Sequence, residues 1–182
     1  MKSVVVYKSH YGATKEYATW LAKALHADLL EHSKVKGDTL LKYDTIIYGG
    51  GLYAGGISGA SLITKNFDKL TNKNIIIFTV GLADPKNPDN VTHILKATDK
   101  IFPPEVKEHL TFFHLRGSMD YSKLNFVHRT MMAMLKHVLS KKSDEELTDE
   151  DKGLLATYGK QVSFLDQKSI TPIVDFASHL SA

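Results

Sequence analysis

Ser9, Gly12 and Thr14 lie in a short segment, SHYGAT, between an apolar run and a pattern of helical spacing. Hydroxyl side chains and a glycine at the start of a helix can bind a phosphate group. The first amides of a helix lack intrahelical partners, and the helix dipole adds partial positive charge there. Gly12 would let the backbone approach the phosphate closely. The alternative is a plain helix cap by Thr14, since Ser, Thr and Gly commonly cap helices.

A second segment, GGGLYAGG over residues 49–56, places Leu52 and Tyr53 among five glycines. Such a density of glycine indicates that the backbone approaches another group closely. A Tyr between glycines can lie flat on a planar ring, whereas the alternative is a flexible loop with one surface Tyr.

A third segment, residues 80–87, offers backbone amides, small residues and Asp84. By itself this third segment is typical of an ordinary turn between a strand and a helix.

Alternating strand and helix patterns place these segments. Apolar, β-branched runs predict strands over residues 3–7, 27–33, 43–49, 74–81 and 110–117. Helical spacing predicts helices from Thr14, over 58–70, over 87–100 and over 170–180. This order predicts an α/β domain with a parallel sheet and helices on both faces. Ligands of such sheets bind outside the carboxyl ends of the strands, where all three segments fall.

Residues 118–168 interrupt the alternation, and we interpret them as a helical insertion in a single domain of residues 1–182. Phe126–Leu139 has an apolar side and a basic side. The apolar side consists of Val127, Met131, Met134, Leu135 and Val138, and the basic side of His128, Arg129, Lys136 and His137. This helix could lie on an anionic membrane, form a Met-lined wall over the site, or pack on the domain with a solvated basic face.

Composition excludes several classes of protein. Among 182 residues, 43% are hydrophobic, 24% are charged and none is cysteine, which rules out disulfides, thiol nucleophiles and Cys-ligated metals. The net charge of +3 is scattered, so we expect no nucleic-acid partner. No apolar run is long enough for a membrane span, and the first residues do not resemble a signal peptide. We therefore expect a cytoplasmic protein, with peripheral contact at the inner membrane surface as one use of residues 123–142.

Other motifs carry less weight. Gly49, Gly51 and Ala54 fit the glycine pattern of dinucleotide-binding turns, but the acidic residue expected after the next strand is absent. The nine histidines show no metal-ligand spacing, so we expect no metal site.

The segments together resemble the flavodoxin family, whose phosphate loop has the form Ser/Thr-x-Thr-Gly-Asn-Thr after the first strand. SHYGAT keeps Ser9, Gly12 and Thr14, whereas Tyr11 and Ala13 replace residues with polar side chains. A narrower similarity is to the menaquinone-dependent protoporphyrinogen oxidases, carried by YDTIIYGGGLYAGG, TVGLADPKN and RGSMDYSKLNFVHRTMMAMLKHV. The pair Tyr53-Ala54 departs from the Arg-Tyr pair expected in those oxidases.

The resemblance implies a flavodoxin-like, doubly wound sheet of five parallel strands in the order 2-1-3-4-5, with FMN as cofactor. The FMN phosphate would then be held by Ser9, His10, Tyr11, Gly12, Ala13 and Thr14. The isoalloxazine ring would be flanked by Gly50, Gly51, Leu52, Tyr53, Ala54 and Gly55. The pyrimidine side of the ring would be lined by Val80, Gly81, Leu82, Ala83 and Asp84.

Three functions remain open at this point. The first is an FMN-dependent oxidoreductase that exchanges electrons with a quinone or another organic substrate, in which the flavin carries the chemistry. The second is a non-enzymatic electron carrier that docks on protein partners. The third is an interaction module that no longer binds flavin. The apolar side of the inserted helix could also pair two chains as a homodimer.

Overall fold

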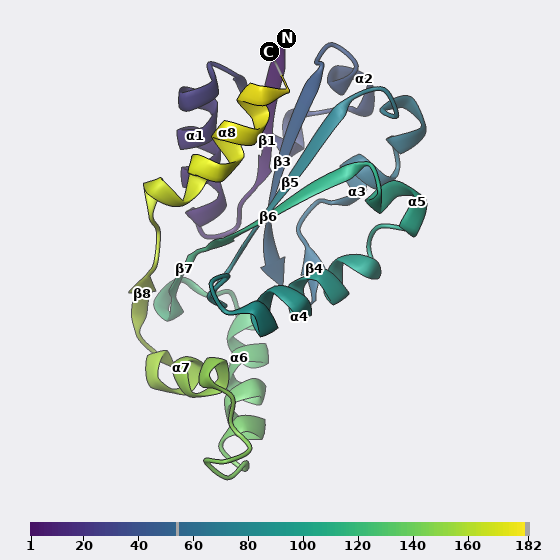
Figure 1. Cartoon of the computed structure of the whole chain (residues 1–182). Coiled ribbons are helices and arrows are strands. Elements are labelled where there is room, and N and C mark those ends of the chain that lie inside the picture. Colours follow the sequence, from purple (N-terminus) through teal and green to yellow (C-terminus); the bar gives the residue numbers. More distant parts are fainter. Residues whose placement is uncertain (54, 181–182) are drawn as a thin grey trace.

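A parallel sheet runs through the centre of the computed structural model, which describes residues 1–53 and 55–180 (Figure 1). Its parallel strands are β1 (Ser3–Lys8), β2 (Asp28–Glu31), β3 (Thr45–Tyr53), β5 (Asn74–Gly81) and β6 (Leu110–Arg116). They lie in the order β2-β1-β3-β5-β6. This confirms the predicted α/β class and the strand order expected of a flavodoxin-like sheet.

One short antiparallel pair belongs to the central sheet, and another forms a separate two-stranded sheet. β4 (Gly56–Ile57) folds back on the end of β3, pairing Leu52 with Ile57. β7 (Ser118–Asp120) pairs with β8 (Gln161–Ser163) and forms the base of the inserted segment. The insertion therefore contains strands as well as helices, because its two ends return side by side.

Helices cover both faces of the sheet. In chain order they are α1 (Ala13–Leu25), α2 (Gly37–Leu40), α3 (Ser61–Thr64), α4 (Pro88–Asp99), α5 (Pro104–Lys107), α6 (Phe126–Leu139), α7 (Asp149–Thr157) and α8 (Thr171–His179). Helices α1 and α8 lie together on one face, and α3 and α5 lie on the other (Figure 1). The inserted helices α6 and α7 extend beyond the carboxyl edge of the sheet.

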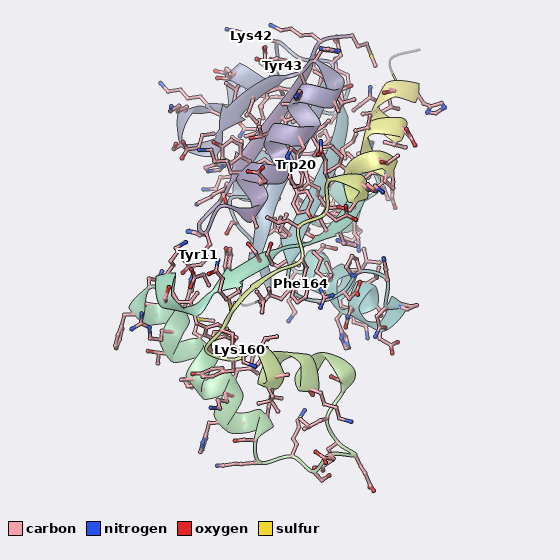
Figure 2. All side chains as sticks on the ribbon, turned by 90° about the vertical axis from the view of Figure 1, so that its left-hand side faces the viewer. Tyr11, Trp20, Lys42, Tyr43, Lys160 and Phe164 are labelled. Carbon is pink, nitrogen blue, oxygen red and sulfur yellow. The ribbon has the colours of Figure 1, made fainter. Side chains whose placement is uncertain are left out.

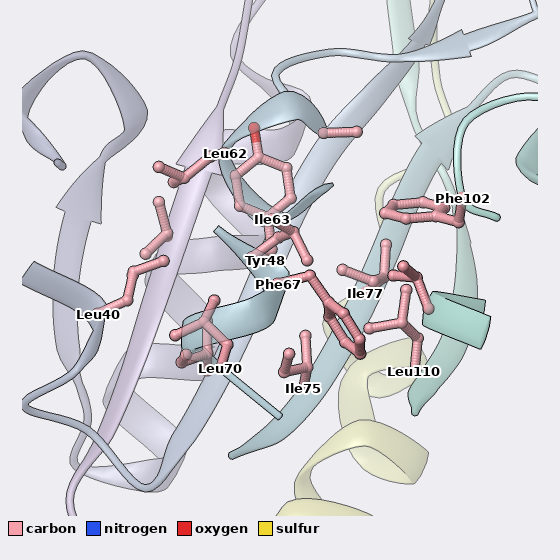
Figure 3. Close-up of a cluster of buried hydrophobic side chains, with 14 of the residues drawn as sticks. Leu40, Tyr48, Leu62, Ile63, Phe67, Leu70, Ile75, Ile77, Phe102 and Leu110 are labelled. Atoms are coloured by element: carbon pink, nitrogen blue, oxygen red, sulfur yellow. The ribbon is translucent and has the colours of Figure 1, made fainter. Parts of the chain in front are cut away.

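A hydrophobic core lies on each face of the sheet because successive strand residues point to opposite sides. Val4 and Val6 of β1 pack in one core, whereas Val5 packs in the other against α1 and α8. Figure 3 shows the first core, where side chains of β3 and β5 meet Leu40, Phe67 and others from the short helices. Both faces of the central strands are thus buried, as their continuous apolar runs predict.

Two predicted elements differ from the structure. The helix expected over residues 58–70 is reduced to α3 and a 3-10 turn at Phe67–Lys69. The side-chain amide of Asn66 donates to the Leu62 carbonyl at 2.8 Å, so it takes an acceptor that a continuing helix would use. Gly59, with φ of +74°, separates the start of this segment from the preceding strand.

The glycine segment after the third strand is also corrected. Gly49, Gly50 and Gly51 are not loop residues: they continue β3 and pair with Phe78, Thr79 and Val80 of β5. The glycines are needed here because neighbouring side chains occupy the space above them. A Cβ atom at Gly49 would lie 2.0 Å from Cζ of Phe78. β3 thereby continues to Tyr53, and β4 begins at Gly56.

No helix among the described residues is long and apolar enough to cross a membrane.

Replacing Gly49 by Ala should lower the free energy of unfolding by about 1–3 kcal/mol, because the new methyl group overlaps the fully buried ring of Phe78. Urea denaturation measures the change. The matched control is Gly153→Ala in α7, where a Cβ atom has open space. This variant should raise the free energy of unfolding by about 0.5–1 kcal/mol, because Ala favours the helix more than Gly does. Equal stability of the two variants would contradict the close packing of β3 on Phe78.

Acidification should destabilise the fold through His114 on β6. Burial lowers the pKa of His114, whose Nδ1 lies 2.8 Å from the hydroxyl of the fully buried Thr79. The unfolded chain regains the ordinary pKa of about 6.5 and so binds more protons below it. The stability contributed by the buried, neutral His114 is present above a pH of about 6.5. It is lost as the pH falls through the lower pKa of His114 in the folded state.

Urea denaturation between pH 7.5 and 5.0 tests this, with His114→Asn expected to show a weaker pH dependence than the wild type. Replacing the exposed His137 by Asn should leave the wild-type dependence intact. The same pH dependence in His114→Asn as in the wild type would show that this histidine is not the titrating group.

Candidate functional site

A cavity of about 450 Å³ lies at the carboxyl edge of the sheet. Its walls come from the loop between β1 and α1, the β3–β4 turn, the loop after β5, and side chains of α4, α6 and α7. The three segments singled out in the sequence therefore meet at one place. No Asp or Glu is among the described residues that line this cavity, so it presents no carboxylate to an anionic ligand.

The start of α1 forms one end of the cavity. Gly12 is its N-cap residue with φ of 99°, a conformation that favours glycine. The Ser9 hydroxyl oxygen accepts the Gly12 N–H at 3.1 Å, and the first helical bond runs from Glu16 N–H to the Gly12 carbonyl at 3.0 Å. Among the described residues, no side chain caps this helix terminus.

The alternative of a plain cap by Thr14 is therefore wrong. Thr14 lies inside the first turn of α1 and is 3% exposed, and the cap position belongs to Gly12. The amides of Ala13, Thr14 and Lys15 are those that an α-helix leaves without intrahelical acceptors. These three amides can therefore donate to a ligand or to solvent at the cavity.

Tyr53 at the end of β3 forms a second wall. Burial and the nearby phenol of Tyr11 raise the pKa of Tyr53 to about 12, so its hydroxyl is neutral at physiological pH. Leu52 and Gly55 also line the cavity, whereas Gly50 and Gly51 lie deeper within the sheet. Ala54 lies outside the described residues.

The loop after β5 is held by the strand beside it. Arg116 of β6 donates through Nε to the Leu82 carbonyl at 3.0 Å, and its Nη1 lies 3.3 Å from Oδ2 of Asp84. The guanidinium stacks 3.6 Å from the ring centre of Phe164 on the chain that returns from α7. From the other side, the Asn90 amide donates to the Asp84 carbonyl at 3.0 Å. Arg116 therefore joins this loop to the base of the insertion.

A cluster of aromatic rings forms part of the cavity wall, with Tyr11, Tyr53 and His128 among the lining residues. The Tyr11 hydroxyl lies 2.5 Å from Nδ1 of His128, and the His128 ring stacks on Tyr53 with centroids 5.1 Å apart and planes within 2°. His10 meets Tyr53 edge-on at 5.1 Å. Burial, Lys8 and His128 together lower the pKa of His10. Figure 2 shows Tyr11 at the end of the sheet that lies next to α6.

Most of the predicted site residues gather around the cavity. Those that line it are Ser9, Tyr11, Ala13, Thr14, Leu52, Tyr53, Gly55, Val80, Gly81, Leu82 and Ala83. The described ones outside its lining are His10, Gly12, Gly50, Gly51 and Asp84. His10 and Asp84 instead contact lining residues or fix the loops that carry them.

Sequence reasoning missed the walls contributed by α4 and α7. Asn90, His93 and Ile94 of α4 and Leu154 of α7 line the cavity, together with His128, Met131 and Met132 of α6. The wall formed by α6 was one of the uses weighed for that helix. The residues of α4 gave no separate signal, because their spacing is that of any helix packed on a sheet.

Among the described residues, no group of three His, Asp or Glu side chains is placed to hold a metal ion.

Comparison with known proteins identifies the family. Residues 4–146 match a sequence model of the flavodoxin domain, so the chain belongs to the flavodoxin domain family. A curated relative, an uncharacterized protein of Methanocaldococcus jannaschii, is 38% identical over 84 residues, which cover 44% of this chain and 55% of that protein. The match thus spans about half the length of the curated relative.

Solved structures of flavodoxins and flavoproteins are similar to this chain. A flavodoxin from the domain Archaea is 19% identical and covers 64% of this chain and 83% of its own, with a TM-score of 0.41. Flavodoxin 2 of Bacillus cereus is 20% identical, and the match covers 64% of this chain and 84% of that protein, with a TM-score of 0.42. A flavoprotein of Lactobacillus acidophilus in complex with FMN is 16% identical, and the match covers 63% of this chain and 91% of that protein, with a TM-score of 0.40.

Replacing Arg116 by Gln should loosen the loop after β5, since its charged hydrogen bonds to Leu82 and Asp84 are lost. We expect amide hydrogen exchange of residues 82–84 to accelerate about tenfold, as for loss of a charged hydrogen bond. The control is Lys69→Gln, which removes the exposed ion pair with Asp38. Faster exchange in both variants, or in neither, would contradict the role given to Arg116.

Proposed function

We propose that the chain is an FMN-binding oxidoreductase that exchanges electrons with an apolar organic substrate. The observation that carries this proposal is the cavity that joins the uncapped start of α1 to Tyr53 and to residues 80–83. A phosphate at α1 would leave the attached ring system between the other two walls. When bound, FMN supplies the redox chemistry, and the protein supplies binding, orientation and electrostatics.

The residues present fit a flavin mononucleotide. A dianionic phosphate suits the amides of Ala13, Thr14 and Lys15 and the dipole of α1. The phosphate would meet no carboxylate among the described residues of the cavity lining. The remaining walls are mainly apolar, with Leu52, Val80 and Leu82 beside the aromatic Tyr53, which suits a planar ring.

An organic substrate is supported by the walls that the insertion adds. Met131, Met132 and Leu135 of α6 and Leu154 of α7 extend the apolar lining beyond the segments that resemble a flavin site. Methionine adapts to varied partners, which suits a flat hydrophobic molecule such as a quinone. A reaction like that of the protoporphyrinogen oxidases belongs to the same proposal, with the Tyr53-Ala54 pair as a departure from that group.

The alternative is an electron carrier that docks on protein partners. Its flavin would exchange electrons with a docked protein and would not need the substrate wall of α6. Steady-state reduction of a quinone by the FMN-loaded protein favours the enzyme, whereas transfer only to redox proteins favours the carrier. A preparation that takes up no FMN would favour the third function, an interaction module that does not bind flavin.

The surface of α6 leaves two further predictions open. Val127, Met134 and Val138 are 61%, 65% and 57% exposed, so this part of the apolar side of α6 is not packed on the domain, whereas Met131 and Leu135 line the cavity. Peripheral membrane contact through residues 123–142 and pairing of two chains both remain predictions for this surface. Vesicle flotation and the molar mass in solution distinguish them.

A matched pair of variants at Ser9 tests the phosphate site. Asp and Asn can both accept the Gly12 N–H as Ser9 does, but only Asp adds a negative charge beside the proposed phosphate. We expect FMN to bind Ser9→Asp at least about tenfold more weakly than Ser9→Asn, because the nearby charges repel each other. Riboflavin, which lacks the phosphate, should bind both variants alike. Titration by flavin fluorescence measures these affinities, and equal FMN affinities would contradict the site.

A further inference from the structure

His128 is brought to the cavity by the insertion. It lies in the first turns of α6, where its backbone N–H bonds to the Asn125 side chain at 2.8 Å and so belongs to the helix cap. Its ring meets residues of the β1–α1 loop and of β3. The inserted helix thereby places an imidazole in the cavity lining, beside Tyr11 and Tyr53.

The imidazole is fixed by two contacts of different kinds. The Tyr11 hydroxyl lies 2.5 Å from Nδ1, and the ring of Tyr53 stacks parallel to the imidazole. The Tyr11 oxygen also accepts the Asn125 N–H at 3.4 Å, which ties it to the cap of α6. With Nδ1 engaged by Tyr11, Nε2 is the ring nitrogen left for a molecule in the cavity, which His128 lines.

We propose that His128 donates a proton to an oxygen atom of a quinone-like substrate in this cavity, and that Tyr11 is the positioning residue that orients its imidazole. This inference rests on the flavin-dependent reduction proposed above. Histidine is the side chain most often used for such proton transfers, and a positioned acid contributes about 10²–10⁴-fold to the rate.

The step balances in protons and electrons. Reduction of a quinone to a hydroquinone takes two electrons and two protons. Bound reduced FMN would supply both electrons and one proton as a hydride, and would be oxidised by that loss. The second proton comes from the imidazolium of His128: its Nε2–H bond breaks, an O–H bond forms on the substrate, and neutral imidazole remains. Solvent then returns a proton to the ring.

The groups that face His128 define its electrostatic surroundings. His10 lies 6.0 Å away between ring centroids, with Tyr11 from the same loop and Tyr53 from β3. The charge of Lys8 acts on this cluster through His10. A pH profile must therefore be compared between variants of His128, because His10 can titrate beside it.

The test is a single-turnover measurement on FMN-loaded protein. The flavin is reduced with light in the presence of EDTA as the electron donor, without oxygen, and its reoxidation is followed after mixing with 1,4-benzoquinone or with ferricyanide. Benzoquinone requires protons, whereas ferricyanide takes one electron and no proton. We expect His128→Asn to slow reoxidation by benzoquinone about 100-fold or more and to weaken the pH dependence of that rate, while the rate with ferricyanide is unchanged.

Three comparisons keep the role of His128 separate from a structural one. Asn can still bond to Tyr11 in place of Nδ1 but does not titrate, and Tyr11→Phe should give a smaller loss, again with benzoquinone alone. His137→Asn makes the same change on an exposed residue of α6 and should react as the wild type. In the oxidised, FMN-loaded wild type, benzoquinone should shift the nitrogen NMR signal of His128 Nε2 and not that of His137.

Each of the following results would overturn the proposal. Equal slowing with both acceptors, or unchanged rates in His128→Asn, would deny a proton-donating role. An unperturbed Nε2 signal in the presence of benzoquinone would place the substrate elsewhere. A wild-type protein that takes up no FMN would overturn the proposed function, and this proposal with it, whereas the other results leave FMN binding intact.

Discussion

The arrangement depends on the unpaired amides at the start of α1. A parallel sheet directs the carboxyl ends of β1, β3 and β5 to one edge, and α1 begins directly after β1 at that edge. Gly12 takes a left-handed conformation, and no described side chain caps the helix, so its first donors remain free for an anion. The proposed cofactor, the orientation of its ring and the position of a substrate all follow from an anion bound there.

The insertion after β6 completes this site as well as extending the chain. Its returning segment stacks Phe164 on Arg116, which holds the loop after β5, while α6 brings His128 to Tyr11 and Tyr53. Both contacts link the added segment to loops of the central sheet. Tyr11, one of the two residues at which SHYGAT departs from the flavodoxin pattern, therefore has a partner in the insertion, His128.

The sequence predicted the elements whose patterns are set locally. β5 is a continuous apolar run and has the bounds expected, as does α6, whose first residue follows an Asn cap. The glycines of β3 were mistaken for a loop because their reason is the ring of Phe78 on the neighbouring strand, which no local pattern reveals. The contact between Tyr11 and His128 joins residues 117 positions apart, and it depends on how α6 returns to the sheet.

The central claim is that the start of α1 binds the phosphate of FMN, and amide NMR during titration with FMN tests it most directly. The account predicts that the largest changes fall on the amides of Ala13, Thr14 and Lys15, with further changes at residues 52–53 and 81–83. Riboflavin should shift the amide signals of residues 52–53 and 81–83 and leave those of Ala13, Thr14 and Lys15 largely unchanged. Amides that stay unperturbed at millimolar FMN, or changes confined to the opposite edge of the sheet, would contradict it.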